Sequence, residues 1–231
     1  MSNYPDVPAG CFDGSLALLI GDSLAGSLFG SFAHGFNDLG LKLLYMGQEG
    51  CDPLLLVPSE RERLRQGPCA KLLVPFDLLL SKPSAIVSVV VTPRMSGRNS
   101  VALWSELISQ FDRSRARILL LAPSPRLELP ALDCVVLSDS YGMDRERCSR
   151  PRGEVKKDRR PIKDTLVKVA DDGYGNVRTI DPIDIFCDPQ VCRPIKGSQL
   201  FYDDEQHLLP SGADKVWRTF VGDFHWAAWK E

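Results

Sequence analysis

Two short segments near opposite ends of the chain carry the side chains of a nucleophilic enzyme. The first, Ile20-Gly-Asp-Ser23, offers a hydroxyl on a tight turn, and the second is Asp204-Glu-Gln-His207-Leu-Leu-Pro-Ser211. A serine hydroxyl is a weak nucleophile at neutral pH and needs an imidazole to take its proton. That imidazole works best when a carboxylate fixes its tautomer. We therefore expect Ser23 to be the nucleophile, His207 the general base and acid, and Asp204 the carboxylate that orients His207.

The surroundings of Ser23 and His207 support this assignment. The apolar run 16–20 predicts a buried strand, and residues 24–36 predict a helix that begins directly after Ser23. At such a junction, free backbone N–H groups and the positive end of a helix dipole favour a developing oxyanion. The chain has three histidines, and only His207 has an acidic residue three positions before it and an apolar helical stretch after it.

The combination of these motifs resembles the SGNH (GDSL) hydrolases, a superfamily of serine esterases and acyltransferases. A closer resemblance is to the SGNH domains fused behind integral-membrane acyltransferases that O-acetylate bacterial surface glycans. Those domains typically show Gly-Asp-Ser after the first strand, a Gly-Cys-x-Pro segment, and a closing pattern of two cysteines and Tyr-x-Asp-x-x-His-Leu. The resemblance runs from about Leu16 to Val221, and its further matching segments are Gly50-Cys-Asp-Pro53, Cys187-Asp188, Cys192 and Tyr202-Asp-Asp204-Glu-Gln-His207-Leu208.

The resemblance implies a function and a cellular location. It implies transfer of an acyl group, expected to be acetyl, to a carbohydrate acceptor such as lipopolysaccharide O-antigen, with the acyl donor delivered by a membrane acyltransferase domain. It implies a periplasmic or other extracytoplasmic location, and we expect a monomer. The Asp-x-x-His spacing selects Asp204 over Asp203 as the partner of His207. Because transfer and hydrolysis share the acyl-enzyme, a secreted carbohydrate acetyl esterase is an alternative.

The expected oxyanion hole is where the chain departs from the family. Fused members usually carry His after the serine, whereas this chain has Leu24. The widespread pattern places a Gly after the second strand and Gly-x-Asn-Asp after the third, but this chain has Thr92-Pro-Arg94-Met95 there, and Asn99 comes too late. The missing asparagine leaves a catalytically decayed glycan-binding module as a further alternative. For an active enzyme, the candidate oxyanion donors are the backbone N–H of Ser23, one near Gly47 or Gly50, and the guanidinium of Arg94.

Seven cysteines are many for a cytosolic enzyme of this size and favour an oxidising compartment. Six fall as pairs close in sequence, and Cys11 is left over. Short-loop disulfides contribute about 3 kcal/mol each when unstrained, and the alternative is that some of these cysteines are reduced core residues. The absence of Cys-x-x-Cys and the scarcity of histidine argue against a metal site, and no dinucleotide or Walker-type motif indicates a cofactor. The expected disulfide pairs are Cys51 with Cys69, Cys134 with Cys148, and Cys187 with Cys192.

The start of the chain lacks an export signal of its own. Residues 1–8 have no basic segment and no apolar core, and no stretch approaches the ~20 apolar residues needed to span a membrane. The expected disulfides nevertheless require export from the cytoplasm. Both observations are explained if the domain is part of a longer polypeptide whose N-terminal part crosses the membrane. We therefore expect residues 1–14 to be a linker and residues 15–231 to be the SGNH catalytic domain.

The composition predicts one globular domain, because 231 residues with 44% hydrophobic and 25% charged side chains suffice for a single well-filled core. The formal net charge of −2 and the lack of a basic stripe with interleaved aromatic residues argue against a nucleic-acid partner. The basic run from Arg145 to Arg160 is expected to be a solvated loop, with contact to an anionic glycan or a lipid headgroup as the alternative. The tail from Phe224 to Trp229 is expected to pack in the core, with contact to a membrane or a partner domain as the alternative.

Apolar runs alternate with helical patterns along the chain. Runs rich in Val, Ile and Leu predict strands buried on both faces, at 16–20, 42–46, 85–91 and 117–122. The helical patterns cover 27–38, 59–66, 100–113, 162–171 and 211–224, and residues 181–202 are expected to form a long loop. This alternation predicts an α/β fold, a three-layer α/β/α sandwich with a central parallel sheet, which the resemblance identifies as the flavodoxin-like SGNH hydrolase fold. Ser23 would then lie beyond the carboxyl ends of the strands, where sites form in such sheets.

Overall fold

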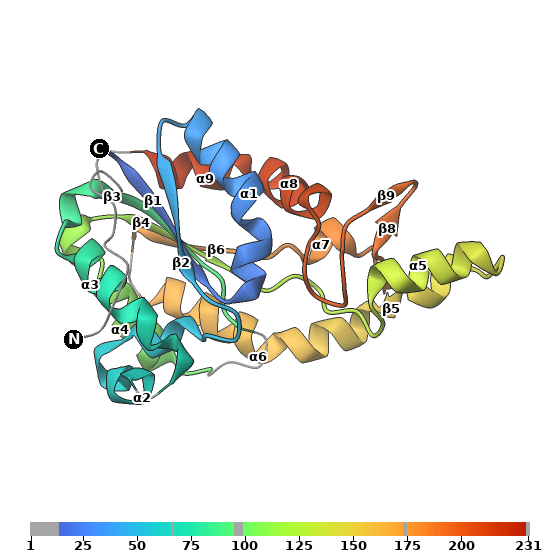
Figure 1. The fold of residues 1–231 in the computed structure, drawn as a ribbon, viewed down its shortest axis with the longest axis horizontal. Helices are drawn as coiled ribbons and strands as arrows, with labels where there is room; N and C mark the ends of the chain where they lie inside the picture. Colours follow the sequence, from blue (N-terminus) through green and yellow to red (C-terminus); the bar gives the residue numbers. More distant parts are fainter. Residues whose placement is uncertain (1–13, 66, 95–98, 173–174, 230–231) are drawn as a thin grey trace.

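The structure is a computed structural model that describes residues 14–65, 67–94, 99–172 and 175–229. Five parallel strands form its central sheet in the order β2-β1-β3-β4-β6 (Figure 1). The α/β fold with a central parallel sheet is therefore confirmed. The expected linker lies almost wholly outside the described residues, as does Cys11. The five strands are β1 (Leu16–Gly21), β2 (Lys42–Gly47), β3 (Ile86–Val91), β4 (Arg117–Leu121) and β6 (Val177–Ile180).

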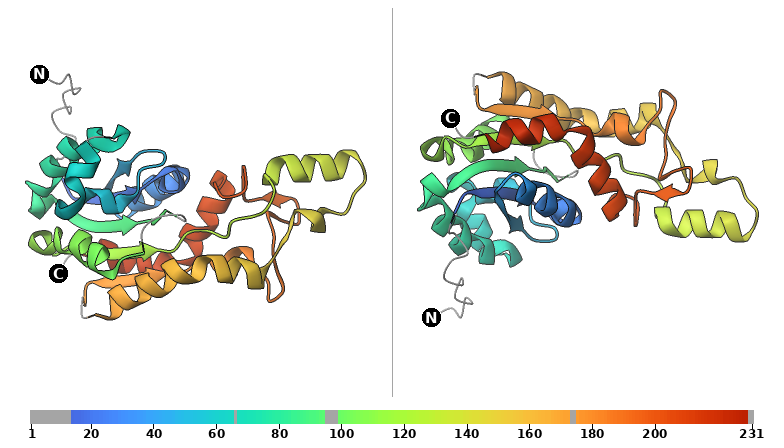
Figure 2. Two further views of the ribbon diagram at one scale, coloured as in Figure 1. Left: turned by 90° about the horizontal axis from the view of Figure 1, so that it is seen from below. Right: turned by 90° about the horizontal axis from the view of Figure 1, so that it is seen from above.

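Helices cover both faces of the sheet, which explains why the central strands are almost wholly apolar (Figures 1 and 2). Alternate side chains of β1 enter two separate cores: Leu18 and Ile20 enter one, and Ala17 and Leu19 the other. On the first face pack α2 (Arg61–Arg65), α3 (Leu73–Leu80), α4 (Val101–Ser109) and α6 (Arg152–Asp171). On the second pack α1 (Ser23–Asp38), α8 (Pro210–Thr219) and α9 (Val221–Ala228).

The basic run was expected to be a solvated loop, and this expectation is wrong. It forms the 3-10 helix η6 (Arg145–Cys148), the short strand β5 (Arg150–Pro151) and the first half of α6, which begins at Arg152 rather than at residue 162. The buried face of α6 follows helical spacing. Arg159 occupies one of the buried positions, so the apolar pattern in the sequence is interrupted before residue 162 and the beginning of the helix was not predicted. The buried positions of α6 are Val155, Arg159, Ile162, Leu166 and Val169.

Other elements also differ from the predicted ones. The helix predicted at 211–224 is two helices, because Phe220 has non-helical backbone angles (φ −107°, ψ 24°) between α8 and α9. The predictions missed α3, α5 (Ala131–Ser140) and the edge strand β6, whose two central residues are exposed. The predicted long loop at 181–202 contains α7 (Ile183–Phe186), β7 (Val191–Cys192), β8 (Ile195–Lys196) and β9 (Gln199–Leu200). The remaining 3-10 turns are η1 (Pro53–Leu56), η2 (Pro58–Glu60), η3 (Pro68–Leu72), η4 (Pro83–Ala85) and η5 (Asp112–Ser114).

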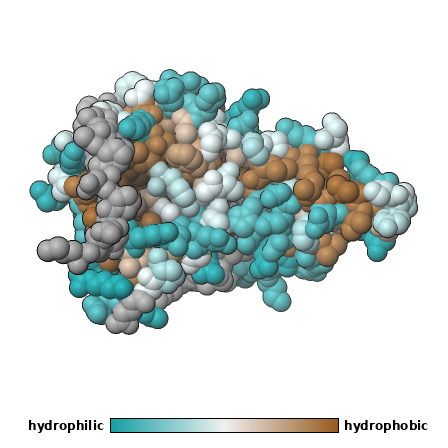
Figure 3. All heavy atoms as spheres, in the orientation of Figure 1, coloured by the Kyte–Doolittle hydropathy of each residue, from teal (hydrophilic) through white to brown (hydrophobic). Residues whose placement is uncertain are grey.

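Three disulfides fix the loops around the sheet, with the pairing expected from sequence proximity. Cys51–Cys69 joins the loop after β2 to η3. Cys134–Cys148 joins α5 to η6, and these two elements form an arm that projects from the body of the molecule (Figures 1 and 2). Hydrophobic side chains gather on this arm (Figure 3). Cys187–Cys192 closes the short loop between α7 and β7.

Candidate active site

Ser23 lies at the carboxyl end of β1, where the chain turns directly into α1. Asp22 caps that helix, because its side-chain oxygen accepts a hydrogen bond from the backbone N–H of Leu24 at 2.9 Å. Gly21 permits the close packing at this turn, since a Cβ there would lie 2.3 Å from Oγ1 of Thr92. As the first residue of α1, Ser23 has a backbone N–H without an acceptor inside the helix, and that group is free to bind an oxyanion.

His207 lies in a turn that is stabilised by hydrogen bonds among its own residues, 203–207. One carboxylate oxygen of Asp204, Oδ1, accepts from the backbone N–H of Gln206 at 2.8 Å and from that of His207 at 2.7 Å. The backbone N–H of Asp203 also donates to the His207 carbonyl at 3.0 Å. Because these bonds join residues close in sequence, the Asp-x-x-His motif specifies the conformation of its own turn.

The fold brings Ser23 and His207 into contact although 184 positions separate them in the sequence. Nε2 of His207 lies 2.8 Å from Oγ of Ser23, and Nδ1 lies 2.6 Å from Oδ2 of Asp204. The imidazole therefore stands between a hydroxyl and a carboxylate, and the carboxylate is that of Asp204 rather than Asp203. This is the spatial order of groups in a serine hydrolase triad.

The Asp204 carboxylate is held in its charged form. Burial alone would raise its pKa, but the backbone N–H groups of His207 and Gln206 and the His207 imidazole outweigh burial and hold the pKa below its usual value. An ionised carboxylate next to Nδ1 keeps a proton on that nitrogen. The other nitrogen, Nε2, then faces Ser23 as a hydrogen-bond acceptor.

Tyr45, on β2, fixes the backbone beside Ser23 and was missed by the sequence analysis. Its hydroxyl donates to the backbone carbonyl of Asp22 at 2.7 Å. Burial and the charge of Asp22 raise the pKa of Tyr45 to about 12, so the phenol remains a donor at neutral pH. Burial also raises the pKa of Asp22, opposed by the Leu24 N–H and the charge of Arg94. The only sequence signal for this contact was a polar aromatic residue near the end of a strand.

The candidate oxyanion donors gather at the same edge of the sheet. Gly47 ends β2 beside Gly21, and its Cβ, if it had one, would lie 2.0 Å from the Gly21 carbonyl. Arg94 follows β3, and one of its guanidinium nitrogens donates to the Gly50 carbonyl at 2.9 Å. Among the described residues, no carboxylate forms an ion pair with Arg94. Its charge acts instead on Asp22, the residue before Ser23.

The chain belongs to the family of SGNH domains that are fused to AT3 domains, which residues 3–221 match. It is accordingly a serine-type enzyme of acyl transfer or ester hydrolysis. No curated protein sequence matches it.

The solved structures that resemble the chain include two acetyltransferase domains. The periplasmic domain of a lipopolysaccharide acetyltransferase from Salmonella ser. Paratyphi A superposes with a TM-score of 0.63 at 16% identity, over 91% of this chain and 84% of that one. The C-terminal catalytic domain of peptidoglycan O-acetyltransferase A from Streptococcus pneumoniae, with a methylsulfonyl adduct, superposes with a TM-score of 0.45 at 11% identity, over 93% and 94%. The first likeness supports the fold described above. Within the described ranges, no helix combines the length and apolar character that a bilayer span requires.

Proposed function

We propose that this domain transfers an acetyl group to a hydroxyl of a bacterial surface carbohydrate, such as lipopolysaccharide O-antigen, through an acyl-enzyme on Ser23. The observation that carries the proposal is the hydrogen-bonded series Ser23–His207–Asp204. It occurs in a chain that belongs to the family of SGNH domains fused to AT3 domains. The first solved neighbour is itself a lipopolysaccharide acetyltransferase domain. It supports acetyl as the group transferred and a periplasmic location for the catalytic domain, which we propose to span residues 15–231 after a linker of residues 1–14.

In the first half-reaction, the Ser23 oxygen attacks the carbonyl carbon of the acetyl donor while Nε2 of His207 takes the hydroxyl proton. The resulting imidazolium lies between the oxyanion intermediate and Asp204, whose charge stabilises it. The carbonyl π electrons move to oxygen, and the N–H groups at the start of α1 face that charge. Collapse of the intermediate expels the donor's leaving group, which takes the proton from Nε2 and leaves acetyl on Ser23.

In the second half-reaction, a sugar hydroxyl replaces the leaving group. Its oxygen attacks the acetyl carbonyl, its proton passes to Nε2 of His207, and the bond between acetyl and Ser23 breaks as Ser23 regains a proton. Water in place of the sugar would give hydrolysis by the same steps, so the position of the acceptor decides between the two outcomes. Family membership supports an acetyl donor delivered by a membrane acyltransferase domain of the same polypeptide.

The proposal is tested by following where the acetyl group goes. The full-length polypeptide in membranes would receive isotopically labelled acetyl donor and de-O-acetylated O-polysaccharide, and the sugar would be analysed by mass spectrometry. We expect labelled acetyl esters on the polysaccharide, and none with Ser23→Ala. Labelled free acetate without sugar ester would support the esterase alternative, and carbohydrate binding with neither product would support the decayed module.

Arg94 is proposed to supply the donor that the family's asparagine would have provided. Arg94→Ala should lower the rate of p-nitrophenyl acetate turnover by about 10²–10³-fold, the loss typical for one oxyanion donor. Arg94→Lys should recover only part of that rate, since an ammonium cannot reproduce the planar fork that also reaches the Gly50 carbonyl.

The matched control for this change is Arg113→Ala, which removes another exposed arginine at the opposite end of the sheet, before β4. Arg113→Ala should leave the rate unchanged. Full activity of Arg94→Ala would assign oxyanion binding to backbone N–H groups alone, including those of Ser23 and the loop at Gly47 to Gly50.

A further inference from the structure

A groove of about 740 Å³ runs along the first half of α6 and carries an excess of positive charge. Six cations and three aspartates line it, which gives a formal charge of +3 (6 − 3). Neither the acyl transfer nor the family match assigns this groove a role. We propose that it binds an acidic carbohydrate, one that bears carboxylate or phosphate groups, as the extended part of the acceptor glycan. The six cations are Arg152, Lys156, Lys157, Arg159, Arg160 and Lys163.

The aspartates of the groove neutralise some of these cations and leave two of them available. Asp181 pairs with Arg159 at 2.6 Å and with Lys163 at 3.2 Å. The other two aspartates each pair with an arginine, Arg160 with Asp164 and Arg152 with Asp184. Lys156 and Lys157 remain, both exposed and without an ion-pair partner among the described residues. An incoming anion would therefore meet two ammonium groups that need not give up an existing partner.

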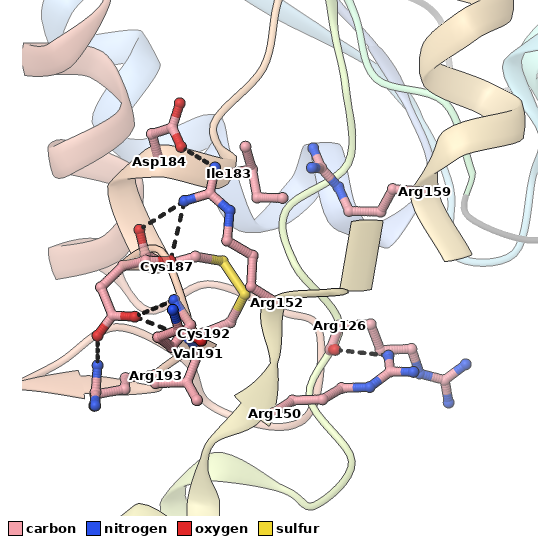
Figure 4. Close-up of a disulfide and its surroundings, with 12 residues drawn as sticks. Arg126, Arg150, Arg152, Arg159, Ile183, Asp184, Cys187, Val191, Cys192 and Arg193 are labelled. Carbon is pink, nitrogen blue, oxygen red and sulfur yellow. Dashed lines mark hydrogen bonds and ion pairs between the residues drawn. A yellow bond between two sulfur atoms is a disulfide. The ribbon is translucent and has the colours of Figure 1, made fainter. Parts of the chain in front are cut away.

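Hydrogen bonds and ion pairs hold the walls of the groove in place, and the contact of Arg159 is buried. Arg159 is only 2% exposed and donates from Nε to the Pro123 carbonyl at 2.8 Å. Arg152 reaches from α6 to the loop closed by the Cys187–Cys192 disulfide, where it donates to the Asp188 carbonyl at 3.0 Å, and it also pairs with Asp184 on α7 (Figure 4). A ligand thus finds a preformed surface and pays little conformational entropy in ordering it.

The groove lies at the same edge of the sheet as Ser23. Asp181 directly follows β6, and the strand order places β6 three positions from β1. With about 4.8 Å between neighbouring strands, the carboxyl ends of β1 and β6 are roughly 14 Å apart along the sheet, a span that a short oligosaccharide can bridge. The segment between them contacts both, because Pro123 accepts from Arg159 and Leu127 donates to the Glu205 carbonyl, in the turn of His207, at 2.7 Å.

The lining favours a water-soluble polyanion over a lipid surface. Apart from its nine charged residues, the described residues that line the groove are Gly153 and Ile183, so they offer little apolar surface to an acyl chain. It is also concave, whereas a bilayer is flat and binds basic side chains that protrude together with apolar ones. The identification of the ligand as part of the acceptor rests on the proposed function, but binding in the groove does not.

The test measures binding in a protein that cannot react. A failure of the groove proposal is therefore distinguished from a failure of the proposed acyl transfer. Isothermal titration calorimetry would use the chain with Ser23→Ala and three oligosaccharides of one length: galacturonic acid, phosphorylated mannose and neutral galactose. We expect binding of at least one acidic oligosaccharide and none of the neutral one. Adding Lys156→Gln and Lys157→Gln should weaken that binding about tenfold, since each lost surface charge contact accounts for a few-fold.

The matched control carries Lys71→Gln and Lys168→Gln, which makes the same change in net charge at two exposed lysines outside the groove. It should bind like the parent. Three results would overturn the proposal: equal binding of neutral and acidic oligosaccharides, equal weakening in the control, or binding to phosphatidylglycerol vesicles with no binding to either acidic oligosaccharide.

Discussion

Replacing Ser23 with Ala should lower turnover of p-nitrophenyl acetate by roughly 10⁴-fold or more, and His207→Ala should do the same. Each change removes one end of the 2.8 Å contact through which the hydroxyl proton leaves. The double variant should be little slower than either single one, because the two side chains act in the same step. Rates in the steady state, with the uncatalysed reaction subtracted, measure this directly.

The control for the nucleophile is Ser27→Ala, one turn further along α1. Within the part of the chain that the structure describes, the Ser27 hydroxyl donates to the Leu24 carbonyl alone, at 2.8 Å, so its loss should leave both folding and turnover intact. Retained activity in Ser23→Ala would refute the proposed mechanism. Multiplicative losses in the double variant would show instead that Ser23 and His207 act independently.

The second large effect is expected for Asp204→Asn, which should slow turnover by about 10⁴-fold while the protein stays folded. The reason lies in the different tasks of the two carboxylate oxygens. Oδ1 accepts from the backbone N–H groups of Gln206 and His207, and an asparagine oxygen can keep both bonds. Oδ2 faces Nδ1 of His207, where the amide would present N–H instead. The imidazole would then carry its proton on Nε2 and could no longer accept one from Ser23.

The neighbouring Asp203→Asn provides the matched control, since Asp203 lies in the same turn but does not orient His207 in the structure. It should retain the parent rate, and circular dichroism should show both variants folded. A large loss in Asp203→Asn with none in Asp204→Asn would move the orienting role to Asp203. No loss in either variant would reduce the catalytic set to a serine–histidine dyad.

The elements that the sequence predicted best are those in which the apolar residues match the buried positions. The strands predicted at 16–20, 85–91 and 117–122 appear within a residue of their bounds, because β1, β3 and β4 are central strands whose side chains are almost all buried and apolar. The edge strand β2 was also predicted within a residue, from the apolar run that follows Lys42. Strand β6 escaped prediction because it is an edge strand of four residues with Arg178 and Thr179 exposed at its centre. The first half of α6 escaped because Arg159, a buried charge, occupies a position of its apolar stripe, where Asp181 and the Pro123 carbonyl compensate it.

The sequence by itself determined the turn that holds Asp204 and His207, since its hydrogen bonds join residues two to four positions apart, and it determined Ser23 as the first residue after a buried strand. Only the tertiary structure decided that His207 meets Ser23, that Arg94 meets Gly50, and that the cations of α6 line a groove at the same edge. The physical reason is that contacts between distant segments depend on strand order and on which helix covers which face. Those arrangements minimise the free energy of the whole chain, and no local pattern of residues encodes them.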